Sequence, residues 1–262
     1  MVYVDELIAS LETSSASASV LSINSGAPTF ADDISLIALT PCNLQTLLDI
    51  VYRYSVKWKF SISVEKSCIL TYGKTKRSKE IPIGILYGDQ YIDIAKSTIH
   101  LGIRQDANLT ISHRITERCQ KAKNSFFAMI GLGLHPTGLN PLTSTSLYQK
   151  IIVPCALYGS ELWNNMTQND INIINRLQHF IVKTIQGFPI RTRSDICESM
   201  LGLNRLSSEV ENRKLMFLHK ILNMSAQSIT QKTTSISSVF RLLLVAGVKS
   251  QCFYIFRSNP DL

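Results

Sequence analysis

The first 50 residues of the chain contain neither lysine nor arginine. Six acidic side chains give this stretch a formal charge of −6, and because the whole chain carries +8, residues 51–262 carry +14. Residues 51–79 alone hold eight basic side chains against a single acid, Glu65. Such a division suits an acidic metal site next to a surface that binds a polyanion. Charge alone fits a solvated lysine-rich face equally well.

Long apolar runs and clustered cysteines are also lacking. No segment is apolar over the length that a membrane-spanning helix needs, and no basic region followed by an apolar core opens the chain, so no signal peptide is predicted. The six cysteines lie at least 26 residues apart without a CxxC or Cys/His zinc pattern. Reduced, mostly packed thiols are therefore expected. We expect an intracellular protein, nuclear or cytoplasmic, without a membrane partner.

The sequence does contain an adjacent carboxylate pair, Asp32-Asp33, between two short apolar runs within residues 28–39. These runs are short enough to be the strands of a β-hairpin with the pair at its tip. Two crowded negative charges favour a shared cation, and Mg²⁺ suits carboxylate oxygens together with water and substrate phosphate. The pair therefore indicates nucleotidyl-transfer chemistry. For these residues taken alone, an ordinary solvated turn is the alternative.

The spacing of apolar residues changes near residue 109. Before it, helices are predicted over 1–13 and 41–57, the second opened by the N-cap Thr40 and Pro41. Short alternating segments between them and residue 105 predict strands, at 60–64, 68–72, 81–86, 91–95 and 98–103.

After residue 109 the spacing is helical. A helix is expected to begin after Thr167 and end at Gly187, and Ser208 with Glu211 has the spacing of a capping box. The four predicted helices cover 109–130, 140–153, 167–186 and 208–223. The fold class is α+β, with a mixed region at 1–105, an all-helical region at 106–225 and an unassigned tail at 226–262.

Six short segments occur along the chain in a recognisable order. They are Phe30-Ala31-Asp32-Asp33, Glu65-Lys66-Ser67, His100-Leu101-Gly102-Ile103, Leu139-Asn140-Pro141, Leu157 to Trp163, and Leu201-Gly202-Leu203. In order and spacing they resemble the reverse transcriptases of non-LTR (LINE-type) retrotransposons, over roughly residues 1–223. The resemblance implies the C-terminal part of a polymerase palm followed by a helical, thumb-like region.

The resemblance also implies roles for single residues. Asp32 would be a metal ligand with Asp33 as its partner, and Lys66 would protonate the departing pyrophosphate. The implied cofactor is Mg²⁺, and the implied partners are an RNA template and a DNA primer. The implied nucleic-acid contacts are a primer-steadying segment and three phosphate-binding side chains, namely His100, Leu101, Gly102, Ile103, Arg114, Arg118 and Lys121.

In this family the fingers, the strand with the first metal-binding aspartate, and any endonuclease come before the segment matched by residues 1–13. The 262 residues are therefore expected to supply half of a two-metal site and to be inactive alone. A basic RNA- or DNA-binding module without catalysis and a non-functional retrotransposon remnant remain as alternatives. Apolar surface or an unpaired strand edge is expected beside the hairpin. Trp58 and Trp163 are expected to pack in the core rather than stack on bases.

Overall fold

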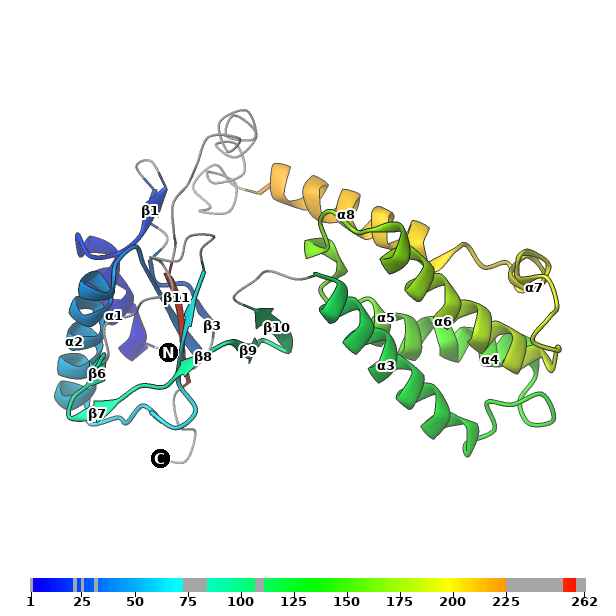
Figure 1. Ribbon diagram of the computed structural model, residues 1–262, viewed down its shortest axis with the longest axis horizontal. Helices are drawn as coiled ribbons and strands as arrows, with labels where there is room; N and C mark the ends of the chain where they lie inside the picture. The colour runs from blue at the N-terminus through cyan, green and yellow to red at the C-terminus, as the bar shows by residue number, and fades with distance from the viewer. Residues whose placement is uncertain are drawn as a thin grey trace. The chain divides into compact units, whose positions relative to one another are not determined.

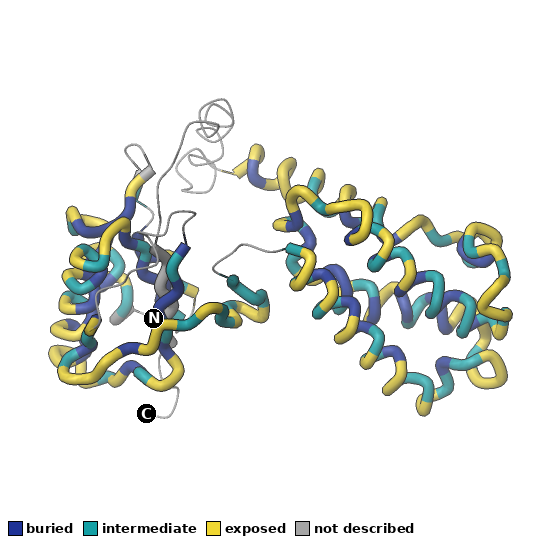
Figure 2. Tube along the Cα trace, in the orientation of Figure 1, coloured by how far each residue is buried: buried dark blue, intermediate teal, exposed yellow. Residues whose placement is uncertain are grey.

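The chain folds into two compact units, one formed by residues 1–109 with 224–262 and the other by residues 110–223 (Figure 1). Each unit has buried segments of its own (Figure 2). The computed structural model describes residues 2–20, 23–24, 26–30, 33–72, 84–106, 111–224 and 252–257.

Over its described residues the first unit contains two helices, α1 (Val2–Thr13) and α2 (Pro41–Trp58), together with short strands. Its central sheet has the order β3-β4-β11-β5-β8, in which every neighbouring pair is antiparallel except the parallel pair β5 and β8. The described strands are β1 (Ser19–Val20), β2 (Ile23–Asn24), β3 (Thr29–Phe30), β4 (Asp33–Ala38), β5 (Cys68–Thr71), β6 (Leu86–Tyr87), β7 (Gln90–Tyr91), β8 (Ile94–Ala95), β9 (Ser97–His100), β10 (Ile103–Asp106) and β11 (Cys252–Arg257).

Helix α2 begins and ends where its sequence predicts. The Thr40 side chain accepts a hydrogen bond from the Asn43 N–H at 3.2 Å, and Pro41 occupies the first helical position, where its missing N–H costs nothing. Lys59 ends the helix in the left-handed conformation, with φ 56°. The predicted stripe is buried and consists of Leu44, Leu47, Leu48, Val51 and Tyr54.

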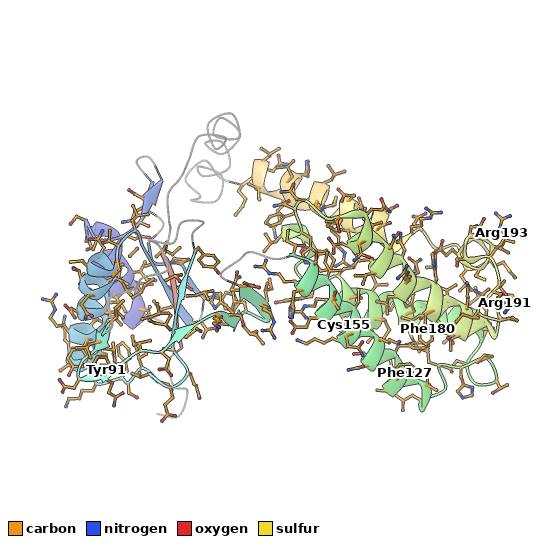
Figure 3. The ribbon with its side chains drawn as sticks, in the orientation of Figure 1. Tyr91, Phe127, Cys155, Phe180, Arg191 and Arg193 are labelled. Carbon is orange, nitrogen blue, oxygen red and sulfur yellow. The ribbon has the colours of Figure 1, made fainter. Side chains whose placement is uncertain are left out.

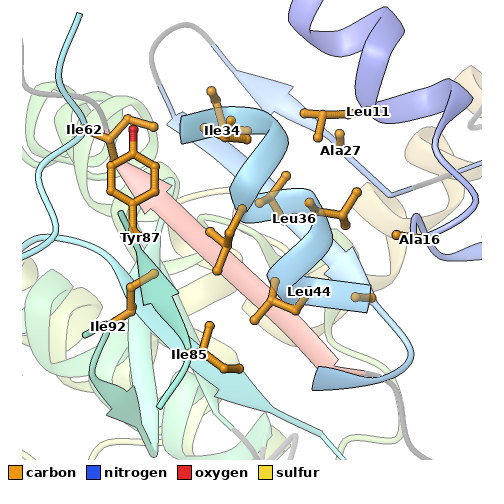
Figure 4. Close-up of a cluster of buried hydrophobic side chains, with 14 of the residues drawn as sticks. Leu11, Ala16, Ala27, Ile34, Leu36, Leu44, Ile62, Ile85, Tyr87 and Ile92 are labelled. Atoms are coloured by element: carbon orange, nitrogen blue, oxygen red, sulfur yellow. The ribbon is translucent and has the colours of Figure 1, made fainter. Parts of the chain in front are cut away.

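The core of the first unit lies between this helix pair and one face of the sheet (Figure 4). Alternate residues of a strand point to opposite faces, and in β4 the side chains of Ile34, Leu36 and Ala38 join the core. Leu36 and Leu44 are fully buried. Burying each such side chain stabilises the fold by about 1.5–3 kcal/mol.

Strand β11 comes from the segment that the sequence analysis left unassigned. Its backbone pairs with β4 over Cys252↔Ala38 to Arg257↔Asp33 and with β5 over Cys252↔Thr71 to Ile255↔Cys68. Strand β4 of the acidic hairpin is therefore interior to the described sheet, whereas β3, the other strand of the hairpin, is its terminal strand. The expected edge beside the hairpin is thus at β3. It is not at β4, which pairs with a segment more than 200 residues away that local sequence patterns do not reveal.

The other strand predictions are confirmed in part. Segment 60–64 is not a strand, because only Ile62 makes an isolated bridge and a turn follows. Segment 98–103 is instead a hairpin, formed by β9 and β10, that reverses at Leu101 and Gly102. Segment 81–86 lies largely outside the described residues.

The second unit is helical over its described residues, as predicted. The segment expected as one helix over 140–153 is divided by the π-helical turn η2. The elements are α3 (Ile111–Ile130), α4 (Pro141–Leu147), η2 (Tyr148–Ile152), α5 (Val153–Ala156), the 3₁₀ turn η3 (Ser160–Leu162), α6 (Gln168–Gln186), α7 (Ser194–Met200) and α8 (Leu206–Leu222).

The predicted ends of α6 are confirmed. Thr167 and Asp170 form a reciprocal capping box, and Gly187 ends the helix with φ 70°. Burial alone would raise the pKa of Asp170, but hydrogen bonds from the Thr167 backbone and from the Ser112 and Thr167 side chains hold this pKa below its usual value. The carboxylate therefore stays charged at the positive end of the helix dipole.

The predicted capping box at the start of α8 is wrong. The helix begins at Leu206, so Ser208 already lies within its first turn. The Leu206 N–H donates to Oε1 of Gln178, and the Ser207 N–H donates to Oδ1 of Asn175 at 3.2 Å. Side chains of α6 thus accept the hydrogen bonds from the first N–H groups of α8, which a local N-cap residue would otherwise accept.

The two tryptophans have different surroundings. Trp163 is buried in the second core, as expected, whereas Trp58 is 38% exposed at the end of α2 and the expectation of core packing is wrong for it. The Lys57 ammonium lies 5.3 Å from the Trp58 ring centroid. Five cysteines form no disulfide, namely Cys42, Cys68, Cys119, Cys155 and Cys197. Burial raises the pKa of Cys119 to about 12, which keeps it a packed thiol. None of the described helices is long and apolar enough to cross a membrane.

Candidate functional site

The acidic hairpin forms as predicted. Strands β3 and β4 pair through Thr29↔Ile34 and Phe30↔Asp33. Asp32, the predicted metal ligand, comes between these strands in sequence and lies outside the described residues. Asp33 is the first residue of β4, and its side chain is 17% exposed. The structure therefore fixes one carboxylate of the pair at the end of a central strand.

Asp33 and Ser35 lie on the sheet face opposite α1 and α2. They alternate along β4 with Ile34 and Leu36, whose side chains enter the core, so their own side chains leave the other face. Ser35 is 7% exposed, which shows that this face is covered at that point. The side chain that lies beside both of them is His100.

His100, the last residue of β9, contacts two residues of the acidic strand. Its Nδ1 lies 3.9 Å from Oδ2 of Asp33, and its Nε2 lies 3.4 Å from Oγ of Ser35, which is 65 residues away in sequence. The His100 side chain is 18% exposed. Two of the segments singled out by their sequence, the acidic turn and His100 to Ile103, are therefore in direct contact.

A tight turn brings His100 to this position. Strands β9 and β10 pair through His100↔Ile103, and the two residues between them, Leu101 and Gly102, have φ of 48° and 72°. Two consecutive positive φ values are typical of a type I′ turn, whose twist suits a two-residue hairpin. The hairpin is also tied to β5, because the Tyr72 hydroxyl that follows this strand approaches Oε1 of Gln105 at 3.5 Å.

The sheet register places Lys66 at the same end of the sheet as Asp33. Because β11 pairs with both β4 and β5, its residue Ile255 is level with Ser35 and with Cys68. Lys66 precedes Cys68 by two residues, just as Asp33 precedes Ser35, and it lies exposed in the turn before β5. Two strand spacings, about 9–10 Å, separate β4 from β5.

The residues at this end of the sheet fit a hard cation in part. Adjacent carboxylates at a hairpin tip provide the oxygen ligands that Mg²⁺ prefers, and Asp33 is held in place by its strand. Within the described ranges, which do not include Asp32, no group of three or more His, Cys, Asp and Glu side chains could hold a metal. The metal roles of Asp32 and Asp33 and the proton-donor role of Lys66 stay predictions.

The basic residues predicted to meet phosphates all lie on α3 and already have neighbours within their own unit. The Arg118 guanidinium lies 4.6 Å from the centroid of the Tyr158 ring, and Lys121 pairs with Glu117 at 3.0 Å. Arg114 is half-buried on the same helix. Their predicted contact with nucleic acid is untested by this geometry.

A second cation lies over aromatic rings farther along α3. The Lys123 ammonium is 5.0 Å from the centroid of Phe180 and 5.8 Å from that of Phe127, and the two rings are 5.8 Å apart (Figure 3). Sequence reasoning missed the contacts of Arg118 with Tyr158 and of Lys123 with Phe180, because in each the aromatic ring lies outside α3 and far along the chain.

The chain is similar to two curated proteins with the same description. It is 26% identical over 211 residues to the RNA-directed DNA polymerase from mobile element jockey of Drosophila melanogaster, covering 78% of this chain and 22% of that protein. It is 25% identical over 178 residues to the protein of the same description from Drosophila funebris, covering 65% of this chain and 19% of that protein. No family model and no solved structure matches.

These similarities confirm that the chain resembles LINE-type reverse transcriptases. The chain spans about a fifth of the length of these relatives.

Proposed function

We propose that this chain is part of the RNA-directed DNA polymerase of a non-LTR retrotransposon, containing the C-terminal portion of the palm and a helical nucleic-acid-binding unit. The contact between Asp33 and His100 carries the proposal, because it joins the acidic turn to the segment expected to steady the primer. A polymerase needs these two elements together, since the primer end must reach the metal. The similarity to the jockey polymerases supports the same conclusion.

Each residue of the site has a stated task in this proposal. Asp32 and Asp33 would hold Mg²⁺, which when bound would offset the negative charge of the phosphates in the transition state. The exposed Lys66 ammonium donates a proton toward the leaving pyrophosphate from the same end of the sheet. His100 keeps the β9–β10 turn against the acidic strand, so that Leu101, Gly102 and Ile103 face the primer backbone.

The 262 residues alone are proposed to bind nucleic acid without extending a primer. Two-metal catalysis needs carboxylates that hold two ions about 3.5–4 Å apart. The residues matched here supply only the Asp32-Asp33 side of such a site. Mg²⁺ keeps most of its water when few carboxylates replace it, so a single weak site is expected.

Primer extension and binding, measured on the same purified chain, test this proposal. Fluorescence anisotropy should show primer–template binding that weakens steeply between about 50 mM and 200 mM salt, because it depends on counterion release. Extension with Mg²⁺ and all four nucleotides should be undetectable. Asp32→Ala should change binding by no more than a few-fold. Asp49→Ala, which removes the same charge from α2, is the matched control.

Magnesium-dependent primer extension that Asp32→Ala abolishes would contradict the proposal that the 262 residues alone are inactive. It would mean that the chain supplies a further carboxylate of its own. Absence of primer–template binding at low salt would contradict the proposed function itself.

A nucleic-acid-binding module without catalysis is the second candidate. The charge of +14 over residues 51–262 favours it, because that charge does not depend on the acidic turn. Mn²⁺ titration followed by electron paramagnetic resonance separates the two candidates. Mn²⁺ binding that is lost in Asp32→Ala and kept in Asp49→Ala favours the polymerase. RNA binding by a chain that binds no Mn²⁺ at the turn favours the module.

A further inference from the structure

The turn that follows α5 presents one aromatic side chain to solvent. Tyr158 is 47% exposed, although its neighbour Leu157 is buried in the core of the second unit. Gly159 takes the left-handed conformation with φ 75°, and the Ser160 N–H donates to the Leu157 carbonyl at 3.0 Å. The backbone on both sides of Tyr158 is thus fixed before any ligand binds.

Two arginines from distant helices meet at this turn. Arg213 of α8 donates from Nη1 to the Leu157 carbonyl at 3.4 Å, while its Nε contacts Oε1 of Glu209 at 3.2 Å. Arg118 of α3 lies with its guanidinium 4.6 Å from the Tyr158 ring centroid. Arg213 therefore anchors the backbone, and Arg118 covers the ring.

An exposed, pre-positioned ring with a guanidinium on it has the chemistry of a base-stacking site. Unpaired bases stack on tyrosine rings and on arginine planes. Each such contact contributes about 1–3 kcal/mol and accepts any base, because every base has a π-face. A turn that is already ordered loses little conformational entropy when the base arrives.

We propose that Tyr158 and Arg118 form a stacking site for an unpaired nucleobase of an RNA strand. The inference rests on the proposed function in one respect, namely that nucleic acid is the ligand. It gives Arg118 a different task from the phosphate contact expected from sequence. Lys121, one turn farther along α3, keeps the electrostatic task.

The test compares two RNA ligands on the full 262-residue chain. One is a single-stranded oligonucleotide carrying the fluorescent base 2-aminopurine, and the other is a blunt RNA duplex of equal length. Tyr158→Ala should weaken single-strand binding by about five- to 150-fold, abolish the change in 2-aminopurine fluorescence and leave the salt dependence unchanged. Duplex binding should stay within about two-fold, because paired bases do not leave their stack for the ring.

Three further variants serve as controls. Tyr158→Phe should keep single-strand affinity, and Tyr158→Leu should lose it while keeping an apolar side chain of similar bulk for packing. Lys121→Ala should weaken the binding of both ligands. For the single strand it should also reduce the magnitude of the slope of log affinity against log salt by about 0.7.

The outcomes separate this inference from the proposed function. A parent chain that binds neither RNA ligand contradicts the proposed function. A parent that binds while Tyr158→Ala and Tyr158→Leu retain single-strand affinity overturns the stacking site alone. A reduced salt slope in Tyr158→Leu would also overturn it, because that result means a phosphate contact.

Discussion

His100 owes its place beside Asp33 to the two residues that follow it. Leu101 and Gly102 both have positive φ, which glycine adopts freely and which costs other residues about 1–3 kcal/mol. The β9–β10 turn thus contains one residue that suits its conformation and one that does not. A second unsuited residue should release the turn, and with it the contact of His100 with the acidic strand.

Gly102→Val should therefore lower the free energy of unfolding by about 1–3 kcal/mol, because a β-branched residue resists positive φ. The measurement is urea unfolding followed by circular dichroism. Gly131→Ala is the control, since no positive φ is recorded there and the added Cβ meets only the Ala128 carbonyl at 3.9 Å. Equal stability of the two variants would show that the turn tolerates side chains at both positions.

His179 is a second residue with a consequence that can be measured. Burial lowers its pKa, although the Glu198 carboxylate 3.2 Å away favours the charged ring, and Lys183 and Arg205 oppose it. The unfolded chain binds a proton near the ordinary pKa of about 6.5, whereas the folded chain binds it only at lower pH. Stability is therefore lost as pH falls below about 6.5, until the folded-state pKa is passed.

We predict that the stability of the His179→Gln variant falls less at acid pH than the stability of the parent chain does. Between about pH 7.5 and pH 5 the melting temperature of the parent should fall more than that of the variant. His113, which is exposed on α3, provides the control substitution His113→Gln. A parent and a His179→Gln variant with parallel pH profiles would contradict the prediction.

At the scale of elements, α6 determines where α8 begins. Gln178 is 1% exposed, and its side chain bonds two segments of the chain at once, accepting from the Leu206 N–H and donating to the Asn204 carbonyl at 2.8 Å. Asn175 accepts from the next N–H of the helix. The amides of one helix thus replace the cap of another.

Gln178→Ala should lower the free energy of unfolding by about 1–3 kcal/mol, because it leaves the buried Leu206 N–H without a partner and removes the hydrogen bond to the Asn204 carbonyl. Thermal unfolding of the variant measures this cost. Gln168→Ala, which removes an amide from an exposed position of the same helix, should stay within about 0.5 kcal/mol of the parent. A small effect at both positions would mean that water reaches the start of α8.

The elements that could be predicted from sequence are those whose signals lie close to their own ends. Helix α2 carries its start signal, Thr40 with Pro41, beside its first turn. Helix α6 carries both its start and its stop signal, Thr167 and Gly187, and these predictions were correct. The start of α8 was misplaced because its partners lie about 30 residues away on α6. The contact of Asp33 with His100 was likewise beyond local patterns, although both residues had been singled out.

At the scale of the whole molecule, the sheet of the first unit depends on β11, the last of the described strands. Strand β11 separates β4 from β5 and forms a ladder with each. The second unit, residues 110–223, lies between these partners in sequence and has a core of its own. Its stability should therefore not require β11.

Deleting residues 251–262 should destroy the cooperative unfolding of the first unit and leave that of the second. Calorimetry should show the loss of one transition, and the far-UV spectrum should keep the helical signal of the second unit. Deleting only residues 258–262, which leaves β11 intact, is the matched control. Two transitions in the longer deletion would show that β4 and β5 hold together without this strand.

The position of β11 also fixes the order in which the chain can acquire its structure. Strand β4 is synthesised early, yet its neighbour is made more than 200 residues later, so the sheet has a high contact order and closes slowly. The helices of the second unit make mostly local contacts and can fold while synthesis continues. Until β11 has been synthesised, one edge of β4 lacks its native partner. A chaperone or a neighbouring nascent chain can bind this edge in the meantime.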